Sequence, residues 1–203
     1  MIFFSLFRLV PFFLVTPEES QTVQNRDNRV EENYIVELES NTTSVAPVET
    51  AGSQNMLVDA ALLENVPDNI ELLLIKYSVQ YGLPLDVVVR LSEVESNHGE
   101  YIRSAQDNYD GSFDIGVLAL NSNFIEYFGE RYFEGDSSLF DPYNPEHNIQ
   151  TGLAYLAHLN ALTEGDLTSA VAAYNCGYRS MKRGEIPSST QRYVKAIIHG
   201  ERL

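Results

Sequence analysis

Hydrophobic residues recur at helical spacing along most of the chain, in short segments separated by glycine and proline. Residues 70–81 and 85–96 form the first two such segments, and each predicts a helix. Asp68 and Glu71 have the spacing of a capping box, so we expect Asp68 to cap the first helix. The second helix is expected to continue to Gly99, because glycine commonly ends helices.

Three further helices are predicted nearer the C-terminus, each preceded by a residue that caps helix ends well. The caps and helices are Asn144, with Pro145 in the first turn, for a helix containing residues 149–159; Asp166 for residues 167–175; and Ser188 or Ser189 for residues 190–199.

Residues 107–122 (DNYDGSFDIGVLALNS) interrupt the helical pattern. Asp110-Gly111 is typical of a hairpin turn because glycine tolerates positive φ, and the residues after it suit short strands. The same residues do not fit a calcium-binding loop, whose first and last positions would lack the required acidic side chains. The predicted class is therefore mainly α, as an α+β arrangement: a helical domain with a small β-hairpin insertion.

The N-terminal part of the chain has a different pattern. Residues 1–15 are almost wholly apolar, but a helix needs about 20 apolar residues to span a bilayer. We interpret them as a signal peptide or an N-terminal anchor. Residues 16–65 are polar and show no sustained period, which predicts an acidic, mostly disordered linker. The folded domain is expected over residues 66–203.

Charge and cysteine content exclude several classes of protein. The chain has 13 Lys and Arg against 29 Asp and Glu, a formal charge of −16, which argues against a nucleic-acid partner. Cys176 is the only cysteine, so neither an intramolecular disulfide nor a multi-cysteine metal site is expected. Serine-hydrolase and nucleotide-binding motifs are also absent from the sequence.

Glu95 is the candidate for acid–base chemistry. Val88, Leu91 and Glu95 share one face of a predicted helix, and that face is otherwise apolar. Desolvation and the helix C-terminus both disfavour the carboxylate, so the pKa of Glu95 is expected to rise, as a general acid requires. The alternative is a solvated glutamate at a frayed helix end. Glu95 and His98 have the Glu-x-x-His spacing of carboxylate-bridged metal sites, but those need two such motifs, so no metal or cofactor is expected.

Two tyrosines suggest a carbohydrate ligand. Tyr174 and Asn175 fall at the end of one predicted helix, and Tyr193 lies on another. A tyrosine offers sugars both a flat ring and a hydroxyl group. The alternative is that both tyrosines are half-buried core residues.

Six short motifs follow one another in order: Glu95-Ser96, residues 111–122 (GSFDIGVLALNS), 140–142 (FDP), 148–156 (NIQTGLAYL), 172–177 (AAYNCG) and 190–194 (TQRYV). Together they resemble the soluble lytic transglycosylase (SLT) domain over roughly residues 68–200. The resemblance is nearest to the small specialised members that accompany secretion systems. It implies a lysozyme-like fold with a small sheet beside a substrate cleft.

The resemblance also implies an activity. A lytic transglycosylase cleaves the β-1,4 bond between N-acetylmuramic acid (MurNAc) and N-acetylglucosamine (GlcNAc) of peptidoglycan and forms a 1,6-anhydro-MurNAc product. Glu95 matches the family's single acid/base residue. The implied substrate-binding positions are Ser96, Gly116, Leu118, Ala119, Tyr174, Asn175 and Tyr193.

The chain departs from the family pattern beside the substrate. Gly116-Val-Leu-Ala-Leu120 stands where the family commonly has Gly-Leu-Met-Gln-Ile, so Ala119 replaces a glutamine and Leu118 a methionine. Two alternatives to a lytic transglycosylase therefore remain: a catalytically impaired glycan-binding or scaffold module, and a lysozyme-type hydrolase.

The expected location and partners follow from the resemblance and the N-terminal segment. The protein is expected to be exported to the periplasm or cell envelope, with peptidoglycan strands as its partner. Residues 1–15 would provide a membrane tether, and envelope or secretion assembly proteins would be further partners.

Overall fold

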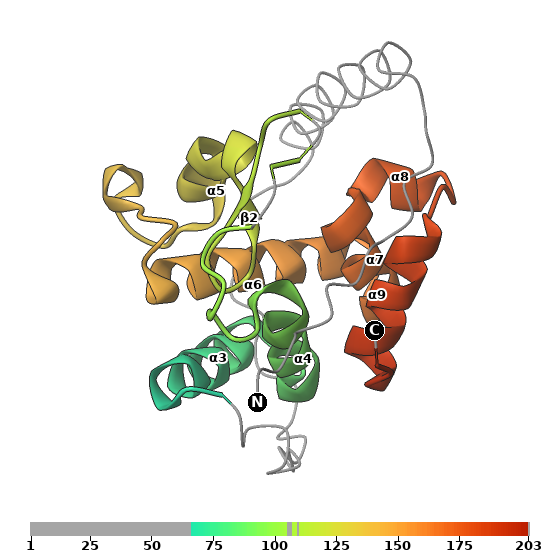
Figure 1. Cartoon of the computed structure of the whole chain (residues 1–203), viewed down its shortest axis with the longest axis horizontal. Helices are drawn as coiled ribbons and strands as arrows, with labels where there is room; N and C mark the ends of the chain where they lie inside the picture. Colours follow the sequence, from blue (N-terminus) through green and yellow to red (C-terminus); the bar gives the residue numbers. More distant parts are fainter. Residues whose placement is uncertain (1–65, 105–106, 109, 203) are drawn as a thin grey trace, which may run out of the picture. The chain divides into compact units, whose positions relative to one another are not determined.

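The computed structural model describes residues 66–104, 107–108 and 110–202, all within one compact unit. These residues form seven α-helices and one small two-stranded sheet (Figure 1), which confirms the predicted mainly helical class with a β insertion. The predictions for residues 1–15 and 16–65 lie outside the described residues. Within the described part of the chain, no helix is both long and apolar enough to cross a membrane.

The first two helices are α3 (Asp68–Tyr81) and α4 (Leu85–Ser96). The prediction that Asp68 caps α3 was wrong, because Pro67 occupies the N-cap and the helix begins at Asp68. The prediction that the second helix reaches Gly99 was also wrong. It ends at Ser96, because Asn97 adopts a left-handed conformation with φ 51°. Asparagine is one of the few residues that visit this region routinely.

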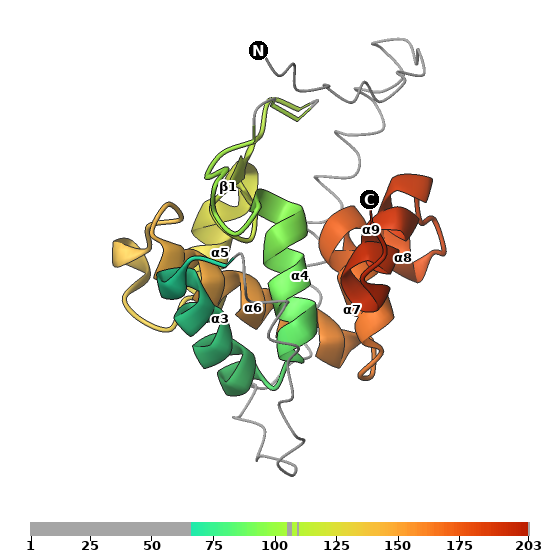
Figure 2. The ribbon, with the colours of Figure 1, turned by 60° about the horizontal axis from the view of Figure 1, so that its bottom comes forward.

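Helix α6 (Pro145–Leu162) forms the centre of the domain. Asn144 caps it as predicted, since its side-chain oxygen accepts hydrogen bonds from the amides of Glu146 and His147. In Figures 1 and 2, α6 runs across the molecule and contacts α3 near one end and α7 near the other. Its predicted apolar residues are all buried in the main core: Ile149, Leu153, Leu156 and Leu159.

Three helices complete the C-terminal part: α7 (Leu167–Cys176), α8 (Tyr178–Lys182) and α9 (Ser188–His199). Asp166 caps α7 as predicted. The prediction that Ser188 or Ser189 caps α9 was wrong, because Pro187 occupies the N-cap and the helix already includes both serines. Helix α9 packs against α4 and α7, as Figure 2 shows, and so brings the C-terminal helices to the end of α4.

The sheet pairs β1 (Asp114–Ile115) with β2 (Leu120–Asn121) in antiparallel register. The strands follow Asp110-Gly111 as expected, but that dipeptide does not join them. The connecting turn consists of residues 116–119, whose end residues Gly116 and Ala119 have φ values of 79° and 49°. Asp110-Gly111 belongs to a separate turn before β1, closed by the Gly111 amide and the Asn108 carbonyl at 2.9 Å.

A second, smaller core lies beyond the sheet. The 3-10 helix η1 (Ser122–Phe124) leads into α5 (Ile125–Tyr132), and η2 (Ser137–Leu139) precedes α6. Aromatic rings of α5 pack against Tyr155 of α6, with a ring-centroid distance of 5.2 Å for Phe128 and 5.4 Å for Tyr132. This packing holds the segment that follows β2 against the central helix α6.

Candidate active site

Glu95 lies in the last turn of α4 and is partly buried. Tyr193, on α9 and 6% exposed, donates a hydrogen bond from its hydroxyl to Oε1 of Glu95. Among the described residues, nothing donates to the other oxygen, Oε2, and that oxygen is not fully buried. The Glu95 carboxyl group therefore has one fixed oxygen and one open oxygen.

The surroundings of Glu95 favour its protonated form. Burial is the largest cause and, with the negative charge of Asp114, raises the pKa of Glu95 to about 7. The hydrogen bond from Tyr193 acts in the opposite direction, because it stabilises the carboxylate. The rise expected from the apolar helix face is therefore present, and Asp114 adds a contribution that the sequence pattern did not indicate.

Tyr174 connects α7 to the turn between the strands. Its hydroxyl donates a hydrogen bond to the carbonyl oxygen of Leu118 at 2.7 Å. Burial is the largest cause that holds the pKa of Tyr174 well above its usual value, and the nearby ionisable groups of Glu95, Tyr155 and Asp114 add to it. Tyr174 therefore stays neutral and lies within electrostatic range of Glu95.

Two buried polar side chains hold the strand turn in place. Ser96 is 1% exposed; its hydroxyl donates to the Val117 carbonyl and accepts from the Gly99 amide, both at 2.8 Å. Asn148, fully buried on α6, accepts from the Leu118 amide at 2.8 Å. Its amide group also donates to the carbonyls of Ile115 at 2.9 Å and Pro142 at 3.0 Å. These bonds fix the turn beside Glu95.

Two glycines make this close packing possible. A Cβ on Gly116 would lie 2.2 Å from Nδ2 of Asn148, and a Cβ on Gly152 would lie 2.7 Å from Cδ1 of Leu118. Gly116 also borders a pocket of about 480 Å³ between the start of α3 and the loop after α4. Neither Glu95 nor Tyr193 lines that pocket, so it is separate from the carboxyl site.

The remaining predicted substrate-binding residues have different environments. Leu118 is fully buried, and its carbonyl accepts the hydrogen bond from Tyr174, whereas Ala119 is partly buried. Asn175 is exposed; its Oδ1 accepts a hydrogen bond from Thr190 at 2.7 Å, and its Nδ2 has no acceptor among the described residues. The structure thus gathers Glu95 and Tyr193 directly, and it gathers the other predicted residues through the turn, except Asn175, which bonds to Thr190. Their roles toward a substrate stay predictions.

Glu95 and His98, which have the Glu-x-x-His spacing, each bond to a different side chain. His98 is 5% exposed, and its Nδ1 lies 2.6 Å from the hydroxyl of Ser92, whereas Glu95 pairs with Tyr193. Within the described ranges, no group of three or more His, Cys, Asp or Glu side chains is arranged to hold a metal ion.

Two residues of the site were not identified from the sequence. Asn148 is a polar residue next to the apolar positions of the predicted helix, a signal that marks a buried hydrogen-bonding side chain. Asp114 was considered only as part of the turn region, yet its charge acts on Glu95. Its neighbours in sequence carry no pattern that places it opposite α4.

Comparisons with known proteins agree with this geometry. A family model described as "Transglycosylase SLT domain" matches residues 73–196. The membrane-bound lytic murein transglycosylase C of Photorhabdus laumondii is 28% identical over 129 residues, which cover 60% of this chain and 34% of that protein. The X-ray structure of an inactive mutant of lytic transglycosylase Slt from Pseudomonas aeruginosa superimposes with a TM-score of 0.55 at 18% identity, over 68% of this chain and 24% of that one.

The fold is thus that of a lysozyme-like lytic transglycosylase domain, helical with a small sheet. The chain belongs to the transglycosylase SLT domain family, whose model matches more than half of its length. It spans about a third of the length of the curated relative and about a quarter of the solved one.

Proposed function

We propose that this domain is a peptidoglycan lytic transglycosylase that uses Glu95 as its acid and base. The observation that carries the proposal is the Glu95 carboxyl group itself, with Oε1 held by Tyr193, Oε2 open and a pKa of about 7. Such a group is substantially protonated at neutral pH and has a free oxygen to present to a ligand.

The reaction needs one carboxyl group and no water. Protonated Glu95 donates its proton to the glycosidic oxygen between MurNAc and GlcNAc, and the bond to the anomeric carbon breaks. The resulting carboxylate then takes the proton of the MurNAc 6-hydroxyl as that oxygen bonds to the anomeric carbon. Glu95 ends protonated, and the product is 1,6-anhydro-MurNAc.

The neighbouring side chains support this cycle. Tyr193 stabilises the carboxylate that forms after the first proton transfer, while the apolar surroundings favour its return to the protonated state. Asn175 has a free amide donor, and Tyr174 is a neutral ring and hydroxyl, so both suit sugar binding. Ser96 and Gly116 hold the turn that carries Leu118 and Ala119.

Digestion of purified cell-wall sacculi with the wild-type protein and with Glu95→Gln tests the proposal. The relative of known structure is described as an inactive mutant with glutamine in place of a glutamate. We expect wild type to release 1,6-anhydro-muropeptides and E95Q to retain its fold but release none. Unchanged release by E95Q would refute the role of Glu95.

Product masses separate the two alternatives. Products heavier by one water molecule would indicate a lysozyme-type hydrolase. Wild-type protein that binds sacculi and releases no soluble muropeptide would indicate a glycan-binding module, for which Ala119 in place of the family's glutamine is the reason. A lost hydrogen bond to a neutral partner costs only about 0.5–1.5 kcal/mol, so we expect turnover to survive this replacement.

We also propose that the domain acts in the cell envelope. The curated relative is described as membrane-bound, and residues 1–15 would serve as a tether or an export signal. Fractionation of cells that express the full chain would locate it. Assembly proteins of the envelope or of a secretion system stay a prediction as partners.

A further inference from the structure

The pocket between the start of α3 and the loop after α4 combines apolar walls with polar side chains, and the reaction above does not use it. Ile70 of α3, Ile102 of the loop and Val117 of the strand turn supply apolar surface. Ile102 and Tyr143 are 52% and 46% exposed, and both line the pocket. A concave, mostly apolar site with a few polar groups is the usual form of a ligand-binding pocket.

His98 presents a hydrogen-bond acceptor to this pocket. It is 5% exposed, and its Nδ1 lies 2.6 Å from the hydroxyl of Ser92. That hydroxyl already donates its single proton to the Val89 carbonyl at 2.8 Å, so Nδ1 carries a proton and donates to Ser92. Burial lowers the pKa of His98, against the charge of Glu93, so the ring is neutral at pH 7 and Nε2 has a free lone pair. Nε2 has no partner among the described residues and is not fully buried, which makes it an accessible acceptor of a pocket-lining residue.

Two exposed side chains add further acceptors. Asn97 and Glu100 also line the pocket, and Nδ2 of Asn97 donates a hydrogen bond to Oε2 of Glu100. This bond orients both groups and leaves Oδ1 of Asn97 and Oε1 of Glu100 without a partner among the described residues. Together with Nε2 of His98, the pocket therefore offers three acceptors, one of which carries a negative charge.

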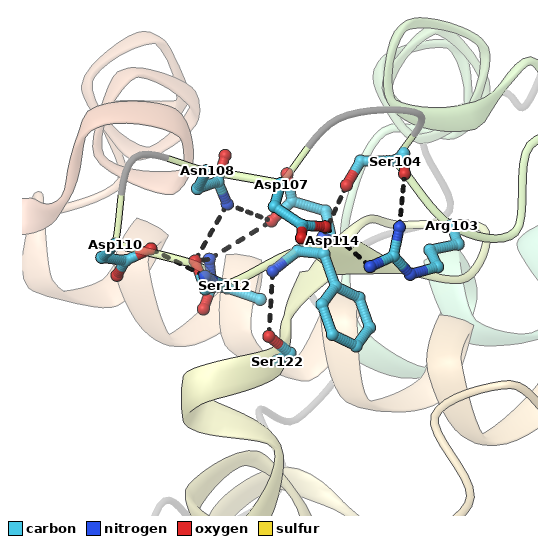
Figure 3. Close-up of polar contacts among 10 residues, drawn as sticks. Arg103, Ser104, Asp107, Asn108, Asp110, Ser112, Asp114 and Ser122 are labelled. Atoms are coloured by element: carbon cyan, nitrogen blue, oxygen red, sulfur yellow. Dashed lines mark hydrogen bonds and ion pairs between the residues drawn. The ribbon is translucent and has the colours of Figure 1, made fainter.

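The loop that carries these acceptors is tied to the sheet. The Ile102 carbonyl accepts a hydrogen bond from the Gly116 amide at 2.9 Å, and Arg103 forms a β-bridge with Ile115. The guanidinium group of Arg103 pairs in turn with Asp107 at 2.7 Å, as Figure 3 shows. The acceptors are thus in place before a ligand binds, and binding costs little reordering of the loop.

These groups suit a primary ammonium ion. An ammonium group has three donors and no acceptor, and its charge is opposite to that of Glu100. No Lys or Arg is among the described residues that line the pocket, so an anion would meet only the Glu100 carboxylate. The start of α6 offers an anion nothing either, because Pro145 has no N–H and Asn144 accepts from the next two amides. Ile102 and Tyr143 provide apolar surface for the aliphatic chain that carries the amine.

We propose that this pocket binds the side-chain amine of a diamino acid in the short peptide of the peptidoglycan strand that occupies the carboxyl site. This inference rests on the proposed function. His98 follows Glu95 by three residues, so their Cα atoms are at most about 11 Å apart, and three extended residues of a peptide span about 10 Å. The two sites also share the strand turn. Gly116 and Val117 line the pocket, and Ser96, the neighbour of Glu95, donates to the carbonyl of Val117.

Peptide binding tests the inference without turnover. The probes are the N-acetylated tetrapeptide L-Ala-γ-D-Glu-L-Lys-D-Ala with a free lysine amine and the same peptide acetylated on that amine, each titrated into the full chain by NMR. We expect wild type to bind the free amine at least about tenfold more tightly, because hydrogen bonds to charged groups are strong.

Three variants locate the amine. His98→Asn lacks Nε2 but keeps an amide that can donate to Ser92 and suits the positive φ of 56°, and it should bind the free amine at least about tenfold more weakly. Glu100→Gln should lose about threefold, since exposed ion pairs contribute little. Glu130→Gln removes a charge from the exposed surface of α5, outside the pocket lining, and should match wild type.

The acetylated peptide distinguishes recognition of the amine from a change in folding. H98N should bind both peptides equally, as weakly as wild type binds the acetylated one, because each change removes the same contact. Equal binding of the two peptides by wild type would overturn the inference, and so would additive losses from H98N and acetylation.

Two further arms separate this inference from its alternatives. If Nα-acetyl-lysine amide binds wild type as tightly as the tetrapeptide does, the assignment to peptidoglycan is wrong, and the amine of another protein becomes the occupant. E95Q leaves the pocket intact and should keep the preference for the free amine. If E95Q still releases muropeptides like wild type, the assignment of Glu95 falls while the pocket keeps its ligand. If E95Q abolishes release and wild type shows no preference for the amine, the proposed function stands and the pocket assignment falls.

Discussion

Replacing Asn148 with alanine tests how the strand turn is held beside the carboxyl site. The fully buried side chain of Asn148 makes three hydrogen bonds of 2.8–3.0 Å, all to backbone groups of other segments. Alanine removes all three and leaves the Leu118 amide and the carbonyls of Ile115 and Pro142 without that partner. Each buried polar group left unsatisfied costs about 1–3 kcal/mol, so we expect the free energy of unfolding to fall by at least about 3 kcal/mol.

Urea denaturation measures this loss, and Asn160→Ala is its matched control. Asn160 lies on the same helix, but its Oδ1 is buried without a hydrogen-bond partner in the structure. Its replacement therefore removes no hydrogen bond through that oxygen and takes away one unsatisfied buried group, so we expect the free energy of unfolding not to fall. The midpoint of N148A should fall at an unchanged m-value. A loss below 1 kcal/mol in N148A, or an equal loss in N160A, would refute the idea that these three bonds fix the turn.

The other two predictions concern the ionisation of Glu95. Tyr193→Phe removes the hydrogen bond that favours the carboxylate, so the pKa of Glu95 should rise above about 7. The alkaline limb of the pH–rate profile of muropeptide release should then move to higher pH. An alkaline limb at the same pH as in wild type would contradict this prediction. Because the pKa of Glu95 is raised from 4.5 to about 7, the folded protein binds a proton in that window that the unfolded chain releases. Between pH 4.5 and pH 8, the free energy of unfolding should therefore fall by about 3 kcal/mol more in wild type than in Glu95→Gln. If denaturation experiments show the same pH dependence of the free energy of unfolding in both proteins, they argue against a buried Glu95.

Local sequence signals predicted most of the helices because their causes are local. Asn144 and Asp166 cap α6 and α7 as expected, since a cap needs only its own side chain and the next two or three amides. The caps that failed, Asp68 and Ser188, both follow a proline. In each case the proline itself takes the N-cap position, and the helix begins one residue earlier than a polar cap would place it.

The position of the turn between β1 and β2 could not be predicted from local sequence. Asp110-Gly111 has the composition of a hairpin turn, yet the chain reverses between the strands at residues 116–119. That turn is selected by a distant residue, because Asn148 of α6 binds the Ile115 carbonyl before the turn and the Leu118 amide within it. A side chain some thirty positions away leaves no trace in the turn's own sequence, except the glycine at 116 that makes room for it.

The carboxyl site likewise has one residue that the sequence predicts and one that it does not. Glu95 could be found from the sequence because its neighbours on the helix, Val88 and Leu91, are fixed by helical spacing and already imply burial. Asp114 could not, because its relation to Glu95 arises only when Ser96 and Tyr174 bind the carbonyls of Val117 and Leu118 and so bring the strand turn to α4 and α7. The pKa of Glu95 is thus set by one cause that lies within its helix and another that tertiary structure supplies. D114N should remove the second cause and leave the first, so the Glu95 pKa in that variant should stay above 4.5.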